Sequence, residues 1–354
     1  MAPERHNDKH TVPNRGWRGL HWSDVASAER GGRMRTVLHV GPSQSRGGMG
    51  AVIQLLVATP PNGWKAEELA SHSDGGSIEV LKAWWRVRKA LKMRLERGGI
   101  DVVHVHTATR WSWKRKVGLI NIAQRFNIPV VLSIHSGDFD RHCKERGPEV
   151  HRICSSVHTV VLTPQWQKKL SPWLGDCSVI PNPVPDVSPS SNRDRNVFLL
   201  MGRSNPMKGQ EIAIEATRIL RAKGHDVTLH LAGMEHSEPG IVGHGWVSGE
   251  DKEHLMSTCG TLLSPSTWEG LSMSVIESMA RGMPVLTSPA SEGVFEQSGM
   301  IVDLDAVAFS EAMLTVMEDK AWQRMADAGP IEAEPYQLAN VIPRWGEVYE
   351  KVIQ

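Results

Sequence analysis

Short runs of Val, Ile and Leu alternate along the chain with longer stretches whose apolar residues recur at helical spacing. Continuous apolar runs are typical of strands buried on both faces, because helices lie above and below a parallel sheet. The pattern therefore predicts an α/β fold in which a doubly wound, Rossmann-like sheet occurs twice. The predicted strands are 36–40, 101–106, 129–135 and 159–163 in the first series, and 197–202, 227–233, 261–265 and 284–288 in the second.

The segment 179–196 separates the two series. It holds four prolines together with Ser, Asn and charged residues, which favour neither a strand nor a helix. We place an interdomain linker at 186–196. The chain is then expected to comprise a flexible N-terminal tail (1–33), a first domain (34–185) and a second domain (197–333).

Length and charge agree with two domains. The 354 residues exceed what one hydrophobic core usually holds, about 250 to 300 residues. Residues 197–354 carry 11 of the 40 basic and 22 of the 39 acidic side chains, which leaves 29 basic and 17 acidic ones before them. The net charge of +1 is therefore the sum of a basic half and an acidic half. It argues against a uniformly basic nucleic-acid binder, and the acidic half disfavours a basic, Trp-rich one.

The cysteine content and the hydropathy restrict the class of protein further. Four cysteines without a CxxC pair indicate neither a disulfide framework nor a zinc site. No apolar run approaches the roughly 18 residues that span a bilayer, and the N-terminus lacks the apolar segment of a secretion signal. We expect a cytoplasmic, globular protein.

Candidate ligand-binding residues follow the predicted strands, where open parallel sheets bind their ligands. After the first strand, Gly47, Gly48 and Gly50 precede or open a helix that begins near Met49. Such a helix directs free N–H groups at a ligand, although glycines in a tight turn often serve packing alone. The spacing is not that of GxxxxGK[ST], so a Walker-type ATPase is not supported.

The second half supplies two cations and two carboxylates. Arg203 and Lys208 lie in a turn that leads into a helix, which suits a diphosphate, although both could be solvated loop charges. Glu269 precedes a helix that holds Glu277, so both carboxylates can face one cleft. A carboxylate is a natural acceptor for ribose or sugar hydroxyls, whereas a lone helical Glu is usually at the surface.

Histidines follow or occupy strands of the first half. His135 ends a predicted strand and is positioned to point into the cleft, although an isolated histidine is more often structural. His104 and His106 share one strand face and could bind a metal in principle. No Asp, Glu or Cys with telling spacing accompanies them, so packing or contact with an acceptor is the better interpretation.

The chain resembles the retaining glycosyltransferases of the B-type fold (GT-B), which include bacterial mannosyl-, glucosyl- and N-acetylglucosaminyltransferases. The motifs that carry this resemblance occur in the family's order from Met34 to about Leu314. They are the GGMG loop, IHSGDF, VIPNPV, GRSNPMKG and WEGLSMSVIESMARGMPVL. The resemblance implies two Rossmann-like domains that face each other across a cleft, the first for the acceptor and the second for a nucleotide-sugar donor. It also implies that residues 334–354 form a helix that crosses back to the first domain.

The resemblance also implies roles for single residues. Arg203 and Lys208 would bind the donor diphosphate, and Glu277 would hold the ribose. Glu269 would lie beside the transferred sugar, and His135 near its reacting carbon. The backbone of Gly270, Leu271 and Ser272 would meet sugar hydroxyls and phosphate, and the loop of Gly47, Gly48 and Gly50 would approach the phosphates or the acceptor.

The expected reaction transfers a hexose from a UDP- or GDP-sugar to a hydroxyl of a glycan or a lipid-linked acceptor, with no metal and no cofactor. No general base is assigned, because family members are thought to pass the acceptor proton to the leaving phosphate. The loop 288–299 departs from the family pattern, since Ala290 and Ser291 stand where glycines are expected and Glu296 is displaced. Its contacts with donor sugar or acceptor are therefore in doubt.

A basic stretch suggests how an acceptor is reached. Lys82–Lys116 holds 11 basic and two acidic residues, with Trp84, Val87, Leu91 and Leu95 along one helical stripe. Basic helices with Trp suit anionic membrane surfaces, so we expect peripheral attachment at the inner face of the plasma membrane. The alternative is an ordinary helix whose stripe packs on the sheet.

Other functions stay open at this point. Within the same fold, a sugar epimerase or a phosphorylase is conceivable, although a phosphorylase needs a longer chain. A non-catalytic nucleotide-sugar or glycan-binding protein is a further alternative, which the set of five polar candidates (Arg203, Lys208, Glu269, Glu277 and His135) disfavours.

Overall fold

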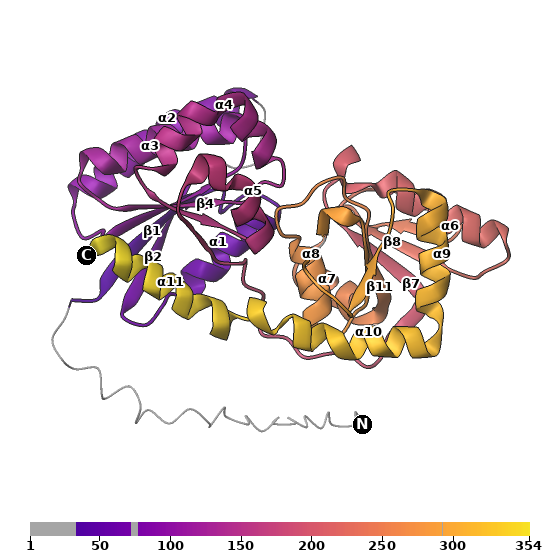
Figure 1. The fold of residues 1–354 in the computed structure, drawn as a ribbon. Helices are drawn as coiled ribbons and strands as arrows, with labels where there is room; N and C mark the ends of the chain where they lie inside the picture. The colour runs from indigo at the N-terminus through magenta and orange to yellow at the C-terminus, as the bar shows by residue number, and fades with distance from the viewer. Residues whose placement is uncertain (1–32, 72–76, 292) are drawn as a thin grey trace, which may run out of the picture. The chain divides into compact units, whose positions relative to one another are not determined.

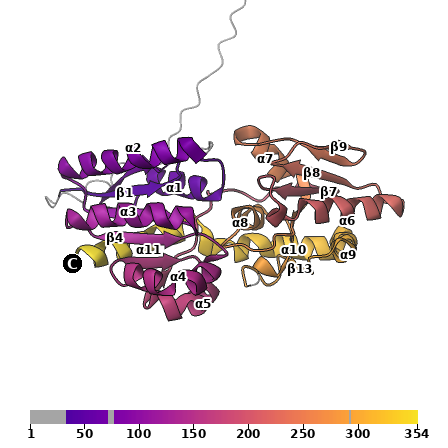
Figure 2. The same cartoon turned by 90° about the horizontal axis from the view of Figure 1, so that it is seen from above.

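The computed structural model describes residues 33–71, 77–291 and 293–354. The predicted tail, 1–33, lies outside the described residues apart from Arg33. The remainder forms two mainly parallel sheets, and helices cover both faces of each sheet, as Figure 1 and Figure 2 show. The prediction of a doubly wound α/β fold that occurs twice is confirmed.

The first sheet has the strand order β2-β1-β3-β4-β5-β6, and its neighbouring strands run parallel. The four strands predicted for this half are β1, β3, β4 and β5, whereas β2 and β6 were not predicted. The strands are β1 (Arg35–Gly41), β2 (Trp64–Ala70), β3 (Val102–Thr107), β4 (Val130–Ile134), β5 (His158–Val161) and β6 (Cys177–Val179).

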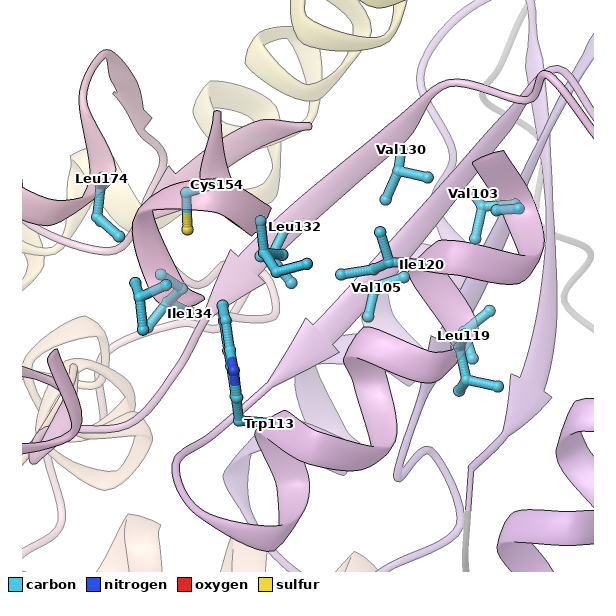
Figure 3. Close-up of a cluster of buried hydrophobic side chains, with 14 of the residues drawn as sticks. Val103, Val105, Trp113, Leu119, Ile120, Val130, Leu132, Ile134, Cys154 and Leu174 are labelled. Carbon is cyan, nitrogen blue, oxygen red and sulfur yellow. The ribbon is translucent and has the colours of Figure 1, made fainter. Parts of the chain in front are cut away.

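Alternate residues of these strands face two different helical layers. One face packs against α2, α3 and α4, and Figure 3 shows Val105 and Leu132 of this face near Ile120 and Trp113. The other face packs against α1 and the last helix, α11. The helices that cover this sheet are α1 (Gly48–Ala58), α2 (Ser77–Glu96), α3 (Trp111–Arg125), α4 (Phe139–Cys154), α5 (Pro164–Leu174) and α11 (Leu338–Ile353).

The second sheet has the order β13-β12-β11-β7-β8-β10-β9, in which only the β9–β10 pair is antiparallel among the described strands. The four predicted strands are β7, β8, β11 and β12. The strands are β7 (Asp194–Met201), β8 (Thr228–Ala232), β9 (Ser237–Glu238), β10 (Ile241–Gly243), β11 (Cys259–Ser264), β12 (Val285–Thr287) and β13 (Gly299–Ile301). The helices are α6 (Gln210–Ala222), α7 (Gly249–Thr258), α8 (Met273–Ala280), α9 (Ala306–Met317) and α10 (Asp319–Glu332).

The predicted linker, 186–196, is too long by three residues. β7 begins at Asp194, which pairs with Cys259 of β11. The polar side chains at 194–196 hid this start, because the hydrogen bonds of a strand pair come from the backbone and need no apolar side chain.

The last helix, α11, packs against the first sheet. Trp345 and Tyr349 are buried in one cluster with Val37 of β1 and Val102 of β3. The Tyr349 hydroxyl lies 2.8 Å from Nδ1 of His104. This helix comes after α10 of the second half along the chain. The end of the chain therefore returns to the first sheet, where the apolar face of α11 packs (Figure 1).

The basic stretch is partly internal, which corrects its predicted extent. Val87, Leu91 and Leu95 of α2 pack into the first core, as the alternative interpretation held. Lys116, the last residue of the predicted surface Lys82–Lys116, is only 1% exposed. It follows Trp113 by three residues on the inner face of α3, so helical periodicity buries it. Among the described residues, no helix is long and apolar enough to cross a bilayer.

We expect Tyr349→Ala to lower the free energy of unfolding by about 3 to 5 kcal/mol, because it removes a fully buried ring between α11 and the first sheet. Tyr349→Phe keeps the ring and removes only the hydrogen bond to His104, so a smaller loss of about 1 to 3 kcal/mol is expected. Urea unfolding measures both values. Equal stabilities of the wild type and Tyr349→Ala would show that α11 does not pack as described.

Candidate functional site

A cavity of about 340 Å³ lies among segments that follow β1, β4, β7 and β11. These are carboxyl ends of parallel strands, where such sheets are expected to bind ligands. Both halves of the chain contribute to its wall. Nine of the predicted site residues line it: Gly47, Gly48, His135, Lys208, Glu269, Gly270, Leu271, Ser272 and Glu277.

Two predicted site residues, Gly50 and Arg203, are not among the residues that line the cavity. Gly50 is buried inside α1, where an added Cβ would be 2.4 Å from the Ser45 carbonyl oxygen, so its absence of a side chain serves packing. Arg203 lies against Gly47, where an added Cβ would be 2.6 Å from its Nη2 atom. Gly47 has a φ of 132°, a conformation that favours glycine, so it fits both the turn and the adjacent guanidinium.

Two loops contact each other beside the cavity at glycines, where no side chain keeps their backbones apart. A Cβ on Gly137 would be 2.4 Å from the carbonyl oxygen of Glu269. A Cβ on Gly270 would be 2.4 Å from the carbonyl oxygen of His135. The two glycines therefore allow the His135 loop of the first half to touch the Glu269 loop of the second half.

Each predicted carboxylate forms an ion pair with a lysine. Lys208 Nζ lies 2.5 Å from Glu269 Oε1, and Lys252 Nζ lies 2.5 Å from Glu277 Oε2. The side chains of Glu269 and Glu277 are 12% and 5% exposed. Charged groups this buried need a partner, and each carboxylate has one in a lysine that also lines the cavity.

Several residues of the cavity wall were not predicted from the sequence. Lys252 of α7 is one, although a lysine in the acidic run GEDKEH was a usable signal. Trp246 and Val247 precede α7, and Trp246 is 39% exposed with the Arg46 guanidinium 5.9 Å from its ring. Asn182 is buried in the VIPNPV motif and also lines the cavity.

Behind His135 lies a buried array of histidines on the sheet face that α11 covers. Nδ1 of His39 is 3.1 Å from Nε2 of His106, and Nδ1 of His106 is 3.0 Å from Nε2 of His135. Burial lowers the pKa of His135 to about 4 and that of His39 to about 3. Burial also lowers the pKa values of His104 and His106 well below the usual range, so all four imidazoles are neutral at pH 7.

His39, His104 and His106 are also the residues that could hold a metal. One ring nitrogen from each lies within 4.8 Å of the others. These nitrogens already have partners: His104 binds Ser133 through Nε2 and Tyr349 through Nδ1, and His106 binds His39. A metal ion would have to replace these hydrogen bonds.

The loop 288–299, which departs from the expected glycine pattern, lies outside the cavity wall where it is described. The Glu332 carboxylate accepts hydrogen bonds from the backbone N–H groups of Glu296, Gln297 and Ser298. Glu296 is thus held by its backbone in a contact with α10.

Two family models match the chain, one in each half. The model described as Glycosyltransferase Family 4 matches residues 53–187, and the model described as Glycosyl transferases group 1 matches residues 195–319. The O-antigen chain mannosyltransferase B of Escherichia coli is 30% identical over 100 residues. That match spans 27% of this chain and 26% of the relative, about a quarter of each.

Solved structures share the fold. Sucrose-phosphate synthase from Thermosynechococcus elongatus superimposes with a TM-score of 0.73 at 17% identity, over 90% of this chain and 98% of that one. The pneumococcal O-GlcNAc transferase GtfA, solved with UDP and GlcNAc, superimposes with a TM-score of 0.61 at 15% identity, over 76% of this chain and 60% of that one. The fold is therefore the GT-B fold, as the sequence motifs indicated.

We expect the free energy of unfolding to fall as the pH is lowered from about 6.5 toward 4. Unfolded histidines take up protons below about 6.5, whereas His39 and His135 stay neutral down to pKa values of about 3 and 4. The unfolded state therefore binds more protons, and each such histidine contributes up to about 1.4 kcal/mol per pH unit. Lys116 has a pKa lowered to about 7 by burial and stays charged in both states below that value, so it adds no slope there.

Urea unfolding at several pH values measures this slope. His106→Phe should reduce the slope, and the same substitution at the exposed His151 is the matched control. If neither His106→Phe nor His151→Phe changes the slope of the unfolding free energy against pH, the claim that His106 is buried and neutral is wrong.

Proposed function

Because the chain belongs to the group 1 glycosyltransferases, we propose that it transfers a hexose from a UDP- or GDP-sugar to a hydroxyl of a glycan or a lipid-linked acceptor, with retention of anomeric configuration. The observation that carries this proposal is the cavity in which two lysines, two carboxylates and a glycine-rich helix start converge. These groups suit the diphosphate, the ribose and the sugar of a nucleotide sugar.

The diphosphate is assigned to Lys208 and the start of α1. Gly47 and Gly48 bring backbone N–H groups and the positive end of the α1 dipole to the cavity wall. Lys208 lines the same cavity, and its ammonium group is paired with Glu269. Cations fixed before the reaction stabilise the negative charge that develops on the leaving phosphate, so we propose that no metal is needed for this step.

The nucleoside is assigned to Glu277 and its neighbours. One carboxylate oxygen, Oε2, contacts Lys252, which leaves Oε1 free to accept a ribose hydroxyl. Trp246 and Val247 line the same cavity and supply apolar surface for a base. These contacts suit a ribonucleoside and do not distinguish uracil from guanine.

The reaction proposed is same-face displacement at the anomeric carbon. The bond from that carbon to the phosphate oxygen breaks while its bond to the acceptor oxygen forms, and the acceptor proton passes to the leaving phosphate oxygen. Glu269 and the neutral His135 lie on the wall beside the sugar and orient it. No side chain is needed as a general base.

For the acceptor we propose attachment of the first half to an anionic membrane surface, through the outer faces of α2 and α3, which pack side by side. Trp85 is 61% exposed and Trp111 is 72% exposed, whereas soluble surfaces rarely leave indoles so open. These two helices and the residues next to them carry exposed cations, and each contributes about 1 kcal/mol near an anionic surface. These cations are Lys82, Arg86, Lys89, Lys92, Arg97, Arg110 and Lys114.

A panel of nucleotide sugars, assayed for nucleoside diphosphate release with and without glycan and lipid-linked acceptors, tests the activity. We expect release with one UDP- or GDP-hexose, and a loss of about 10²- to 10³-fold in kcat for Lys208→Ala, because the leaving phosphate loses a fixed cation. Glu277→Ala should mainly raise the KM for the donor, because the ribose loses its acceptor.

The exposed residues Lys223 and Glu311 of the same half are matched controls, and Lys223→Ala and Glu311→Ala should behave as wild type. Binding of a nucleotide sugar without turnover would instead identify a non-catalytic binder. If the protein binds no nucleotide sugar and releases no nucleoside diphosphate from any donor, the proposal is refuted.

Sedimentation with liposomes that contain phosphatidylglycerol tests the membrane surface. Wild type should sediment at moderate salt, and Trp85→Ser combined with Trp111→Ser should weaken binding, because the apolar contact is lost. Ile331→Ser, at a residue 72% exposed in the second half, is the matched control and should bind as wild type. Absence of wild-type binding, or equal binding by all variants, would rule out attachment through this surface.

A further inference from the structure

Three histidines form a hydrogen-bonded series from the interior of the first sheet to the cavity. His39 comes from β1, His106 from β3, and His135 directly follows β4. These strands are neighbours in the sheet, and the three positions share one face because side chains alternate along a strand. Strand register therefore places His39 and His106, and His135 is the first residue after β4.

The two hydrogen bonds connect the rings in a fixed sense. Nδ1 of His39 faces Nε2 of His106 at 3.1 Å, and Nδ1 of His106 faces Nε2 of His135 at 3.0 Å. A neutral imidazole carries one N–H, so His106, which takes part in both contacts, donates in one of them and accepts in the other. It follows that all three rings carry their proton on the same nitrogen, either all on Nδ1 or all on Nε2.

The surroundings of His106 keep the series neutral. His106 is fully buried, and the groups that act on its charge are His104, His135, His39 and Lys116, of which none is acidic. His104 stacks on it with ring centroids 4.1 Å apart, and makes its own hydrogen bonds to Ser133 and Tyr349. His104 is thus a neighbour of the series and not a member.

The series ends at the ligand cavity. His135 lines the cavity, and its Nε2 is engaged by His106, so Nδ1 is the ring nitrogen that remains for a ligand. Lys208 and Lys252 lie on the same wall, which suits a ligand rich in phosphate and hydroxyl oxygens. An N–H donor at Nδ1 complements those oxygens, whereas an unprotonated Nδ1 would face them with a lone pair.

We propose that His39 and His106 are positioning residues that hold His135 in the Nδ1–H form, so that the cavity presents one fixed N–H donor to the sugar or phosphate of the donor substrate. The nature of that ligand rests on the proposed function. The shared tautomer does not, because it follows from the hydrogen bonds among the three rings.

Long-range ¹H–¹⁵N spectra of the histidine side chains test the proposal without substrate. The 16 histidines are assigned by the signals that each single variant loses. We expect His39, His106 and His135 of the wild type to be neutral at pH 7 and protonated on Nδ1. A different nitrogen protonated in any of the three, or fast exchange between tautomers, would overturn the proposal.

Breaking the series tests its effect on His135. His106→Phe keeps an aromatic ring and removes both ring nitrogens, so the Nδ1–H form of His135 should give way to a mixture of tautomers. His104→Phe is the matched control, since it also removes a buried imidazole with two hydrogen bonds from β3, and it should leave the His135 signals unchanged. His39→Phe breaks the series at its far end and covers the case in which His106→Phe fails to fold.

Kinetics complete the test once a donor is known. His106→Phe should lower kcat about tenfold more than His104→Phe does, as loss of an orienting partner commonly does. Equal losses in the two variants would show that the effect is structural and would overturn the positioning role. If no nucleotide sugar is turned over, the proposed function fails while the tautomer measurement still decides the inference.

Discussion

Gly137 and Gly270 allow two loops to approach until backbone touches backbone. Added Cβ atoms at these positions would lie 2.4 Å from the carbonyl oxygens of Glu269 and His135, far inside a normal contact. The wall that both halves share depends on this approach, because it brings the end of β4 in one sheet beside the segment after β11 in the other. A side chain on either glycine would separate His135 from the carboxylate that shares its wall.

The charges around this contact are balanced in pairs. Lys208 neutralises Glu269, and Lys252 neutralises Glu277, at carboxylates that are 12% and 5% exposed. An arriving diphosphate would add negative charge where the lysines and the start of α1 already point. The acidic composition of the second half therefore does not indicate the charge of its ligand, whereas the position of its lysines at the cavity wall favours an anionic one.

Strands and site residues could be predicted from the sequence where they follow from the local pattern of apolar and polar residues. Strands buried on both faces, such as β3 and β11, contain consecutive Val or Leu residues that predicted them, and the carboxyl-end rule then indicated that Lys208, Glu269 and Glu277 line one cavity. Strand β2 was missed because its segment, WKAEELA, mixes charged and apolar residues at a sheet edge.

Contacts between distant segments could not be predicted. The pairing of Lys252 with Glu277 depends on how α7 lies against α8, and the bond between His39 and His106 depends on strand register. Arg203 lies against Gly47 and not in the cavity wall for a similar reason, since the spacing of Arg203 and Lys208 does not fix which of the two points inward. Sequence analysis singled out His106 and His135 of the histidine series one by one, whereas His39, within the apolar run TVLHV, was not considered.

The central claim is that this cavity binds a nucleoside diphosphate through groups from both halves of the chain. A crystal structure of the protein soaked with UDP or GDP tests it most directly. The account predicts the diphosphate between Gly47–Gly48 and Lys208, with the ribose on the Glu277 carboxylate. A nucleotide bound away from this wall, or an empty cavity at millimolar nucleotide, would contradict it.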